Sequence, residues 1–231
     1  MIPDELKEKT KSELQQALVN PVKLLMFTQE LECKFCSETR QLLQELAVLS
    51  DKITIETYDL MTNADKAKAF NIDKVPAIVV MGEKDYGIRI YGMPYGYEFQ
   101  TLLAAVVAVS RRETDISETT KSKLKEIKTH VKIQVFVTLT CPYCPIMASM
   151  AHKFAMENDL IEADAVDAGE FPQLAIKYMV MGVPKTVIND KVEFVGALPE
   201  DAFLRQVLQA IGEPSQQEQP PQPQESAMTS Q

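Results

Sequence analysis

The sequence predicts an α/β protein made of two tandem units, each with a mixed central sheet flanked by helices. A C-x-x-C motif occurs twice, starting at Cys33 and at Cys141, 108 residues apart. The dipeptide Val75-Pro76 returns at the same offset as Val183-Pro184. Short apolar segments alternate with amphipathic helical patterns around both motifs. A duplicated domain accounts for all three observations.

The elements of the first unit follow from the spacing of its apolar residues. Apolar positions recur near helical spacing before Asn20-Pro21 and again after Cys36, and short apolar runs between them predict strands. A strand, a crossover helix and a second strand should form a right-handed parallel unit, and the last two strands an antiparallel hairpin. The expected helices are 4–19, 36–49, 64–70 and 98–110. The expected strands are 22–27, 53–58, 77–81 and 88–91.

The second unit repeats the same order of patterns around its own C-x-x-C motif. Its apolar runs predict strands, and the amphipathic stretches between them predict helices. The expected helices are 117–129, 146–157, 171–179 and 199–211. The expected strands are 131–137, 161–166, 185–188 and 192–195.

Composition suggests where the units meet and where they end. Residues 110–120 are rich in charge and hydroxyl groups, which is typical of a junction. We therefore expect one domain at 1–115 and a second at 116–212. Residues 213–231 are mostly Gln, Pro, Ser and Glu and cannot build a core, so we expect a disordered tail.

Charge and hydropathy narrow the classes of function. The 231 residues carry a formal net charge of −9, which argues against nucleic acid as a partner because phosphate binding needs clustered Lys and Arg. Residues 3–11 are polar, so no signal-peptide core follows Met1. No apolar run approaches the length of a membrane span. We expect a cytoplasmic protein with no membrane association.

The two C-x-x-C motifs are the candidate catalytic groups. Both stand where a buried strand ends and a helix begins, and the free N–H groups at a helix start stabilise a thiolate. A spacing of three places both sulfurs on one helix face, with Cα atoms within disulfide distance. We expect Cys33 and Cys141 to attack a disulfide, and Cys36 and Cys144 to resolve the mixed disulfide.

The Val-Pro dipeptides are the candidate substrate-binding residues. A proline after valine at a strand start is a good candidate for a cis peptide bond. Such a loop would turn the backbone of Val75 and Val183 outward, beside Pro76 and Pro184. An extended peptide could then pair with it as an added strand, so the expected substrate is a protein disulfide.

These features together resemble the thioredoxin-like superfamily, and residues 138–144, ending in Cys-Pro-Tyr-Cys, are similar to glutaredoxin. Two such units with both dithiols kept resemble the glutaredoxin-like protein disulfide oxidoreductases of thermophilic archaea and bacteria. The resemblance implies an enzyme that reduces, forms or isomerises protein disulfides and is recharged by a thioredoxin-reductase-like flavoprotein. It also implies that the two units join edge to edge into one sheet.

Several residues depart from the thioredoxin pattern. Phe27 and Val135 occupy the strand position where thioredoxins carry a buried acid. Pro145 should restrict Cys144 toward extended geometry and loosen the first helical turn.

Met179 and Met181, just ahead of the second Val-Pro, are expected to fill gaps in the core.

The two dithiols should differ in reactivity. Cys33 has three acids close in sequence, Glu30, Glu32 and Glu38, against two cations, Lys34 and Arg40. Around Cys141, no charged residue lies from Val135 to Ala151. Nearby carboxylates disfavour a thiolate. We therefore hypothesise that Cys141 is the more acidic and more reactive thiol.

Other functions fit parts of the same pattern. One alternative enzyme role is a dedicated electron donor that passes reductant from a flavoprotein to a peroxiredoxin. A non-enzyme alternative is a zinc-binding or protein-holding module, because four thiolates suit tetrahedral zinc. Each cysteine pair opens a long helix in a well-cored unit, however, so we expect no metal and no cofactor beyond the redox-active disulfides.

Overall fold

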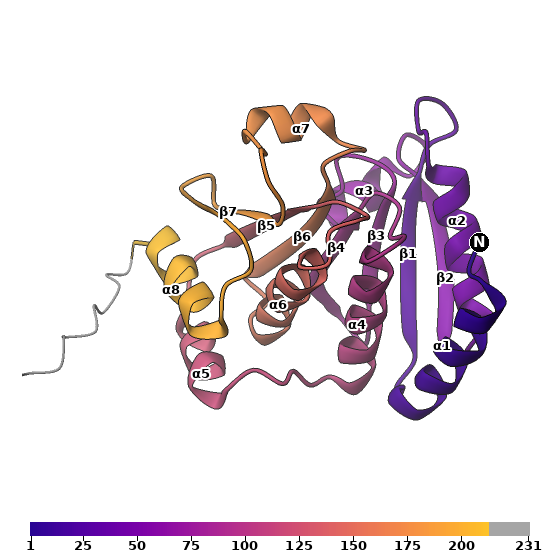
Figure 1. The fold of residues 1–231 in the computed structure, drawn as a ribbon, viewed down its shortest axis with the longest axis horizontal. Helices are drawn as coiled ribbons and strands as arrows, with labels where there is room; N and C mark the ends of the chain where they lie inside the picture. Colours follow the sequence, from indigo (N-terminus) through magenta and orange to yellow (C-terminus); the bar gives the residue numbers. More distant parts are fainter. Residues whose placement is uncertain (213–231) are drawn as a thin grey trace, which may run out of the picture.

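One eight-stranded mixed sheet runs through both halves of the chain in the computed structural model, which describes residues 1–212 (Figure 1). The predicted tail at 213–231 lies outside the described residues. The strands are β1 Val22–Thr28, β2 Ile53–Asp59, β3 Ala77–Met81, β4 Asp85–Tyr91, β5 Val131–Val137, β6 Ile161–Asp167, β7 Lys185–Ile188 and β8 Val192–Val195. The helices are α1 Asp4–Ala17, α2 Cys36–Ala47, α3 Ala64–Ala69, α4 Glu98–Arg111, α5 Glu118–Glu126, α6 Cys144–Glu157, α7 Pro172–Lys177 and α8 Glu200–Ala210.

The two units have the same strand pairing, as the internal repeat predicts. In the first, β1 pairs in parallel with β2 and antiparallel with β3, and β3 pairs antiparallel with β4. In the second, β5 stands in the place of β1, with β6 parallel on one side and β7 antiparallel on the other, followed by β8. The predicted parallel unit and hairpin are therefore confirmed in each half.

The units join through β4 of the first unit and β6 of the second, which are neighbours in the middle of the sheet. Strands β4 and β6 pair in parallel from Ile88 opposite Ala163 to Tyr91 opposite Val166, giving the order β2-β1-β3-β4-β6-β5-β7-β8. Gly87 precedes this pairing with a φ of +76°, and a Cβ at this position would collide with the carbonyl oxygen of Ile161. The edge-to-edge join implied by the family resemblance is confirmed.

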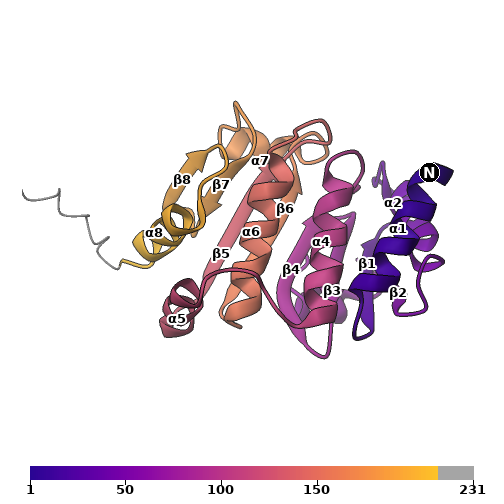
Figure 2. The same ribbon diagram turned by 60° about the horizontal axis from the view of Figure 1, so that its bottom comes forward.

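Helices cover both faces of the sheet. On one face α4 and α6 lie side by side, one from each unit, with α1 and α5 nearby (Figure 2). Their apolar side chains, including Val106 and Ala148, belong to one continuous core that spans both units. Helices α3 and α7 cover the opposite face over a smaller core that includes Ala67 and Phe136.

Most element boundaries agree with the sequence patterns within a few residues. The clearest difference is β4, which begins at Asp85 rather than at residue 88. Arg89 explains it: this strand residue is 2% exposed, and its guanidinium donates hydrogen bonds to both carboxylate oxygens of Asp85 at 2.8 and 2.6 Å. A buried arginine therefore lies in this strand and pairs with a partly exposed aspartate, which an apolar pattern cannot reveal.

The units are linked by the segment between Arg111, where α4 ends, and Glu118, where α5 begins. Ser117 caps α5 by accepting a hydrogen bond from the backbone N–H of Thr120 at 3.2 Å. The domain boundary between residues 115 and 116 stays a prediction, and it falls in this link. None of the helices in the described part of the chain has the length and hydropathy needed to cross a bilayer.

Candidate active site: two dithiols on one edge of the sheet

Both C-x-x-C motifs are closed as disulfides in the structure. Cys33 bonds to Cys36 and Cys141 to Cys144, and the Cα atoms of each pair are 5.5 Å apart. This separation is within the range that a disulfide tolerates, as expected. Only the second cysteine of each pair is helical, however, because α2 begins at Cys36 and α6 at Cys144, so the two sulfurs do not share a helix face.

The two disulfides lie on the same edge of the sheet. Strands β1, β4, β6 and β5 all run in one direction, because β3 is antiparallel to both of its neighbours. Each motif follows the carboxyl end of its strand, β1 or β5, and these strands are four positions apart in the sheet. At about 4.8 Å per strand, the dithiols are roughly 20 Å apart.

The first cysteine of each pair is the more accessible one. Cys33 is partly exposed and Cys36 is 4% exposed, while Cys141 and Cys144 are 8% and 0% exposed. The backbone N–H of Cys144 points at the Sγ of Cys141 from 3.1 Å, at the start of α6. An N–H in that position stabilises negative charge on this sulfur once the disulfide opens.

The expectation for Pro145 is wrong. Cys144 is the first residue of α6, and Pro145 lies in the opening turn of the helix. The first helical residues have no intrahelical partner for their N–H groups, so a proline there removes no hydrogen bond. The helix therefore starts at the resolving cysteine with Pro145 in place.

The Val-Pro loops have the expected peptide geometry, since both Val75-Pro76 and Val183-Pro184 are cis. The carbonyl oxygen of Val183 lies 3.8 Å from the Sγ of Cys141. The carbonyls of Pro76 and Pro184 accept hydrogen bonds from glycine N–H groups at 2.9 and 2.8 Å. Within residues 1–212, no other backbone group bonds the N–H or C=O of Val183. An extended chain could therefore pair with this valine next to the sulfur.

The strand positions six residues before the first cysteines hold no acid, since Phe27 and Val135 are completely buried. The structure instead buries the carboxyl group of Glu98, at the start of α4, where neither oxygen has a hydrogen-bond partner. Glu98 and Asp167, from different units, both line a small cavity of about 10 Å³ with Val137. Burial and the nearby Asp167 raise the pKa of Glu98 to about 7.

Sequence reasoning missed Glu98 because an acid in the first turn of a helix usually only complements the helix dipole.

Asp167 and Asp59, at the carboxyl ends of β6 and β2, act as turn residues. Asp167 accepts hydrogen bonds from the N–H groups of Gly169 and Glu170 at 2.7 and 2.9 Å. Asp59 accepts equivalent bonds from Met61 and Thr62.

Glu170 is a second acid that the sequence did not reveal. It belongs to the second unit, but its carboxylate accepts a hydrogen bond from the N–H of Met93 in the first unit at 2.7 Å. Burial raises its pKa to about 7, with the charges of Asp167 and Glu38 acting in the same direction. The charges of Glu38 and Lys34, in and next to the first C-x-x-C motif, thus reach this carboxyl group of the second unit.

We expect a Glu98→Gln variant to change how stability depends on pH. The pKa of Glu98 rises from 4.5 in the unfolded chain to about 7 in the folded protein, so protonation favours folding. This contribution is complete below pH 4.5 and is lost as pH rises through 7, a loss of about 2–3 kcal/mol. Between pH 5 and 8 the free energy of unfolding should fall by about that much more in wild type than in the variant. Urea denaturation at both pH values measures the free energy of unfolding. An equal decrease in wild type and variant between pH 5 and pH 8 would contradict the assignment.

The expectation that Met179 and Met181 fill the core is wrong. They are 68% and 95% exposed, just ahead of the Val183-Pro184 loop. Helix α7 is short and ends at Lys177, so the chain that follows it crosses the surface instead of the interior.

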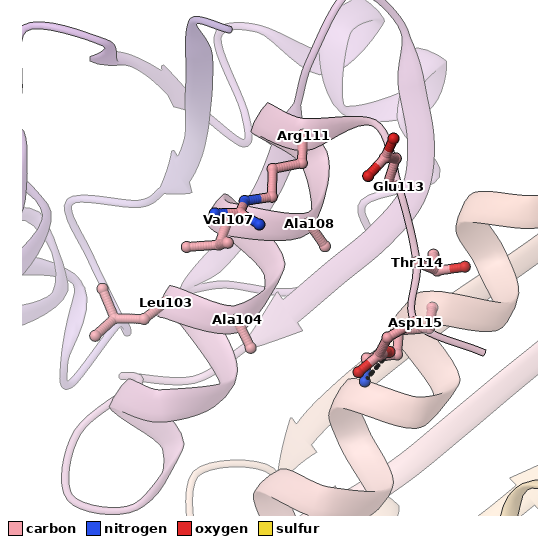
Figure 3. Close-up of a pocket in the computed structure, with 9 residues that line it drawn as sticks. Leu103, Ala104, Val107, Ala108, Arg111, Glu113, Thr114 and Asp115 are labelled. Carbon is pink, nitrogen blue, oxygen red and sulfur yellow. Dashed lines mark ion pairs between the residues drawn. The ribbon is translucent and has the colours of Figure 1, made fainter. Parts of the chain in front are cut away.

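A cavity of about 570 Å³ lies away from both dithiols, between α4, the link after it and α6 (Figure 3). Leu103 and Val107 form its apolar side, and Lys153 pairs with Asp115 across its rim at 2.5 Å. No cysteine or Val-Pro residue lines it. In residues 1–212, no cluster of three or more His, Cys, Asp or Glu side chains could hold a metal ion.

Comparisons with known proteins agree with this geometry. Residues 131–209 match the family model described as a thioredoxin domain. A protein disulfide oxidoreductase from Aeropyrum pernix superposes with a TM-score of 0.86 at 30% identity, covering 92% of this chain and 95% of that one. Thioredoxin from Methanocaldococcus jannaschii is 37% identical over 78 residues, which are 33% of this chain and 92% of the relative.

Longer proteins also match the chain. One component of the alkyl hydroperoxide reductase of Escherichia coli is 25% identical over 191 residues, which are 83% of this chain and 34% of that protein. The chain thus spans about a third of the length of several curated relatives. With two thioredoxin-fold units, a closed dithiol in each and near-complete coverage of the Aeropyrum pernix protein, the chain belongs to the protein disulfide oxidoreductases of the thioredoxin-like superfamily.

Proposed function

We propose that this protein is a thiol–disulfide oxidoreductase that reduces, forms or isomerises disulfides in other proteins. The observation that carries the proposal is the presence of two C-x-x-C dithiols next to helix starts, both beyond the carboxyl ends of sheet strands. In each pair the Cα atoms are 5.5 Å apart and the sulfurs form a disulfide. A dithiol that opens and closes in place can exchange two electrons with a client disulfide.

At the second site, Cys141 attacks a client disulfide as a thiolate. One client sulfur bonds to Cys141, and the other leaves as a thiolate and takes a proton. Cys144 then attacks Cys141 Sγ as a thiolate, closes the internal disulfide and releases the second client thiol. The client gains two electrons and two protons, and the protein loses both. The same steps in reverse form a disulfide in the client.

The remaining residues guide the client. Val183 and Pro184 form the groove at the second site, where the valine carbonyl lies beside Cys141, and Val75 and Pro76 take the equivalent place in the first unit. A strand-like pairing with the valine backbone would align the client cysteine with the attacking sulfur. Cys33 and Cys36 perform the same exchange in the first unit.

We further propose that the second site is the more reactive one. Its attacking sulfur has a backbone N–H at 3.1 Å, and the sequence around it carries no charge from Val135 to Ala151. The first motif contains Lys34 and is followed by Glu38, and the charges of both act on Glu170 of the second unit. Neighbouring carboxylates work against a thiolate at Cys33.

Acceleration of insulin reduction by dithiothreitol tests the proposal. Precipitation of the insulin B chain should start earlier with wild type than with dithiothreitol alone. Cys141→Ser should lose most of this acceleration, whereas Cys33→Ser should keep most of it. An absence of acceleration by wild type would contradict general disulfide reductase activity.

The second candidate function is a dedicated electron donor. The match to one third of the alkyl hydroperoxide reductase component favours it. In this role a thioredoxin-reductase-like flavoprotein would reduce the chain in the cytoplasm, and the chain would reduce a peroxiredoxin. A donor of this kind would be inactive on insulin but would be reduced by such a flavoprotein at a measurable rate.

A further inference from the structure

A short segment of the first unit reaches across to the second dithiol. We call residues 92–97, which join β4 to α4, the strap. The backbone N–H of Tyr97 donates a hydrogen bond at 3.0 Å to the carbonyl of Leu139. Leu139 stands two residues before Cys141, in the loop between β5 and the C-x-x-C motif. The first unit therefore contacts the loop that carries the attacking cysteine of the second unit.

Gly96 fits closely into this contact. Its φ is +60°, and a Cβ at this position would collide with the carbonyl oxygen of Leu139. Glycine alone combines a left-handed backbone with so close an approach of two chains. The strap thus lies directly against the peptide group of Leu139, and any larger residue at position 96 forces one of the two apart.

The strap is fixed at both ends. The N–H of Gly92 donates to the carbonyl of Pro76 at 2.9 Å, and the N–H of Met93 donates to the carboxylate of Glu170 at 2.7 Å. At its other end the strap runs directly into α4, whose apolar side chains are part of the core. A segment held in this way is a rigid support for the residues that it contacts.

The loop between β5 and Cys141 is held from both units. Within the second unit, the N–H of Cys141 donates to the carbonyl of Thr138 at 3.1 Å, and from the first unit Tyr97 bonds to Leu139. The loop sets where the Sγ of Cys141 lies, 3.1 Å from the N–H of Cys144. Hydrogen bonds weaken steeply away from their best geometry, so a small shift of the loop reduces the stabilisation of a thiolate on Cys141.

The first motif lacks this support. Leu31 stands two residues before Cys33, as Leu139 does before Cys141, at the offset of 108 residues. Leu31 is 76% exposed, and within residues 1–212 its carbonyl accepts no backbone hydrogen bond. Leu139 is half-buried. The shared fold therefore does not require the strap contact, which belongs to the second dithiol.

We propose that Gly96 and Tyr97 of the first unit are positioning residues for the dithiol of the second unit. They hold the loop before Cys141 so that its sulfur stays aligned with the N–H of Cys144. This inference rests on the proposed function, because it assigns part of the reactivity of the second site to the first unit. The second site is then incomplete without the first unit, which is a chemical reason for joining the two in one chain.

The test uses the full chain with Cys33→Ser and Cys36→Ser, which leaves only the second dithiol. Two rates are measured, kcat/KM for hydroxyethyl disulfide and alkylation of reduced Cys141 by iodoacetamide at neutral pH, mapped by mass spectrometry. Gly96→Ala should lower both about five- to tenfold, as partial loss of a hydrogen bond to a charged sulfur would give. Alkylation in guanidinium chloride, where the fold is absent, should be unchanged.

Gly212→Ala is the matched control. Gly212 also has a positive φ, +87°, but a Cβ at that position would meet no atom within 4 Å. This variant carries the same kind of backbone strain without the contact, so it should change neither rate. In a chain that keeps only the first dithiol, Gly96→Ala should leave kcat/KM unchanged, because the strap does not contact the loop before Cys33.

Tyr97→Pro removes the hydrogen-bond donor itself and serves if Gly96→Ala fails to fold. The φ of Tyr97 is −66°, which proline adopts, and the residue lies just ahead of α4, so the helix can still form. We expect the same decrease in both rates. Tyr97→Ala keeps the N–H and should behave like the parent protein, which separates the donor from the ring.

The possible failures are distinguishable. Unchanged rates in Gly96→Ala and Tyr97→Pro, or an equal decrease in Tyr97→Ala, would overturn the positioning role while leaving disulfide exchange intact. A decrease that disappears when Glu98→Gln is present in both compared proteins would also overturn it, because the strap would then act through that buried acid and not through Leu139. If the parent protein does not reduce hydroxyethyl disulfide, the proposed function itself is wrong.

Discussion

A Cys144→Ser variant is expected to trap its clients as covalent mixed disulfides with Cys141. Without the second sulfur, the mixed disulfide can be released only by an external thiol. An intramolecular thiol acts at an effective concentration far above the millimolar range, so turnover at this site should fall about 100-fold or more. The measurement is single-turnover reduction of a model disulfide peptide in the Cys33→Ser, Cys36→Ser background. Non-reducing electrophoresis and mass spectrometry then identify the adduct.

Two controls test whether Cys141 is the attacking cysteine. Adding Cys141→Ser to the trap should abolish the adduct, because no attacking sulfur remains. The reciprocal trap, with Cys141→Ser and Cys144 intact, should form little adduct, since Cys144 is completely buried. An adduct on Cys144 at the rate seen for Cys141 would show that the roles of the two cysteines have been assigned in the wrong order.

A Gly87→Ala variant is expected to lose about 2–6 kcal/mol of stability. Gly87 combines a φ of +76° with close contact to the carbonyl of Ile161, where β4 meets β6. An alanine there adds backbone strain and a steric collision, each costing about 1–3 kcal/mol. Chemical denaturation followed by circular dichroism measures the loss as a lower midpoint.

Gly196→Ala is the matched control for this change. Gly196 also has a positive φ, +97°, but a Cβ at that position would meet no atom within 4 Å. It should lose only the strain contribution, so the difference between the variants isolates the contact between the two units. Equal losses in the two variants would mean that β4 and β6 move apart without cost.

The repeat explains why so much of the fold follows from the sequence. Strands β3, β5, β7 and β8 begin and end at the expected residues, because apolar runs bounded by turn residues leave few alternatives. The cysteine pairs and the cis peptides follow from short motifs whose geometry is local. The roles proposed for these residues in catalysis and client binding stay predictions.

Other features depend on contacts between distant parts of the chain. Glu98 is an ordinary first-turn acid in sequence, and only the packing of one unit against the other buries it beside Asp167. Met181 has the composition of a core residue, yet the short helix α7 leaves it on the surface. The expectation for Pro145 fails for a local reason, because the apolar pattern places the helix start at residue 146, two residues too late.

The parallel pairing of β4 with β6 also protects each half from self-association. If either half were produced alone, one side of β4 or β6 would present unsatisfied amide and carbonyl groups along an apolar strand, which includes Ile88 and Ile90 in β4 or Ala163 in β6. Strands of this kind template the addition of further chains. In the described residues, joining the halves in one polypeptide leaves β2 and β8 as the two outermost strands of the sheet.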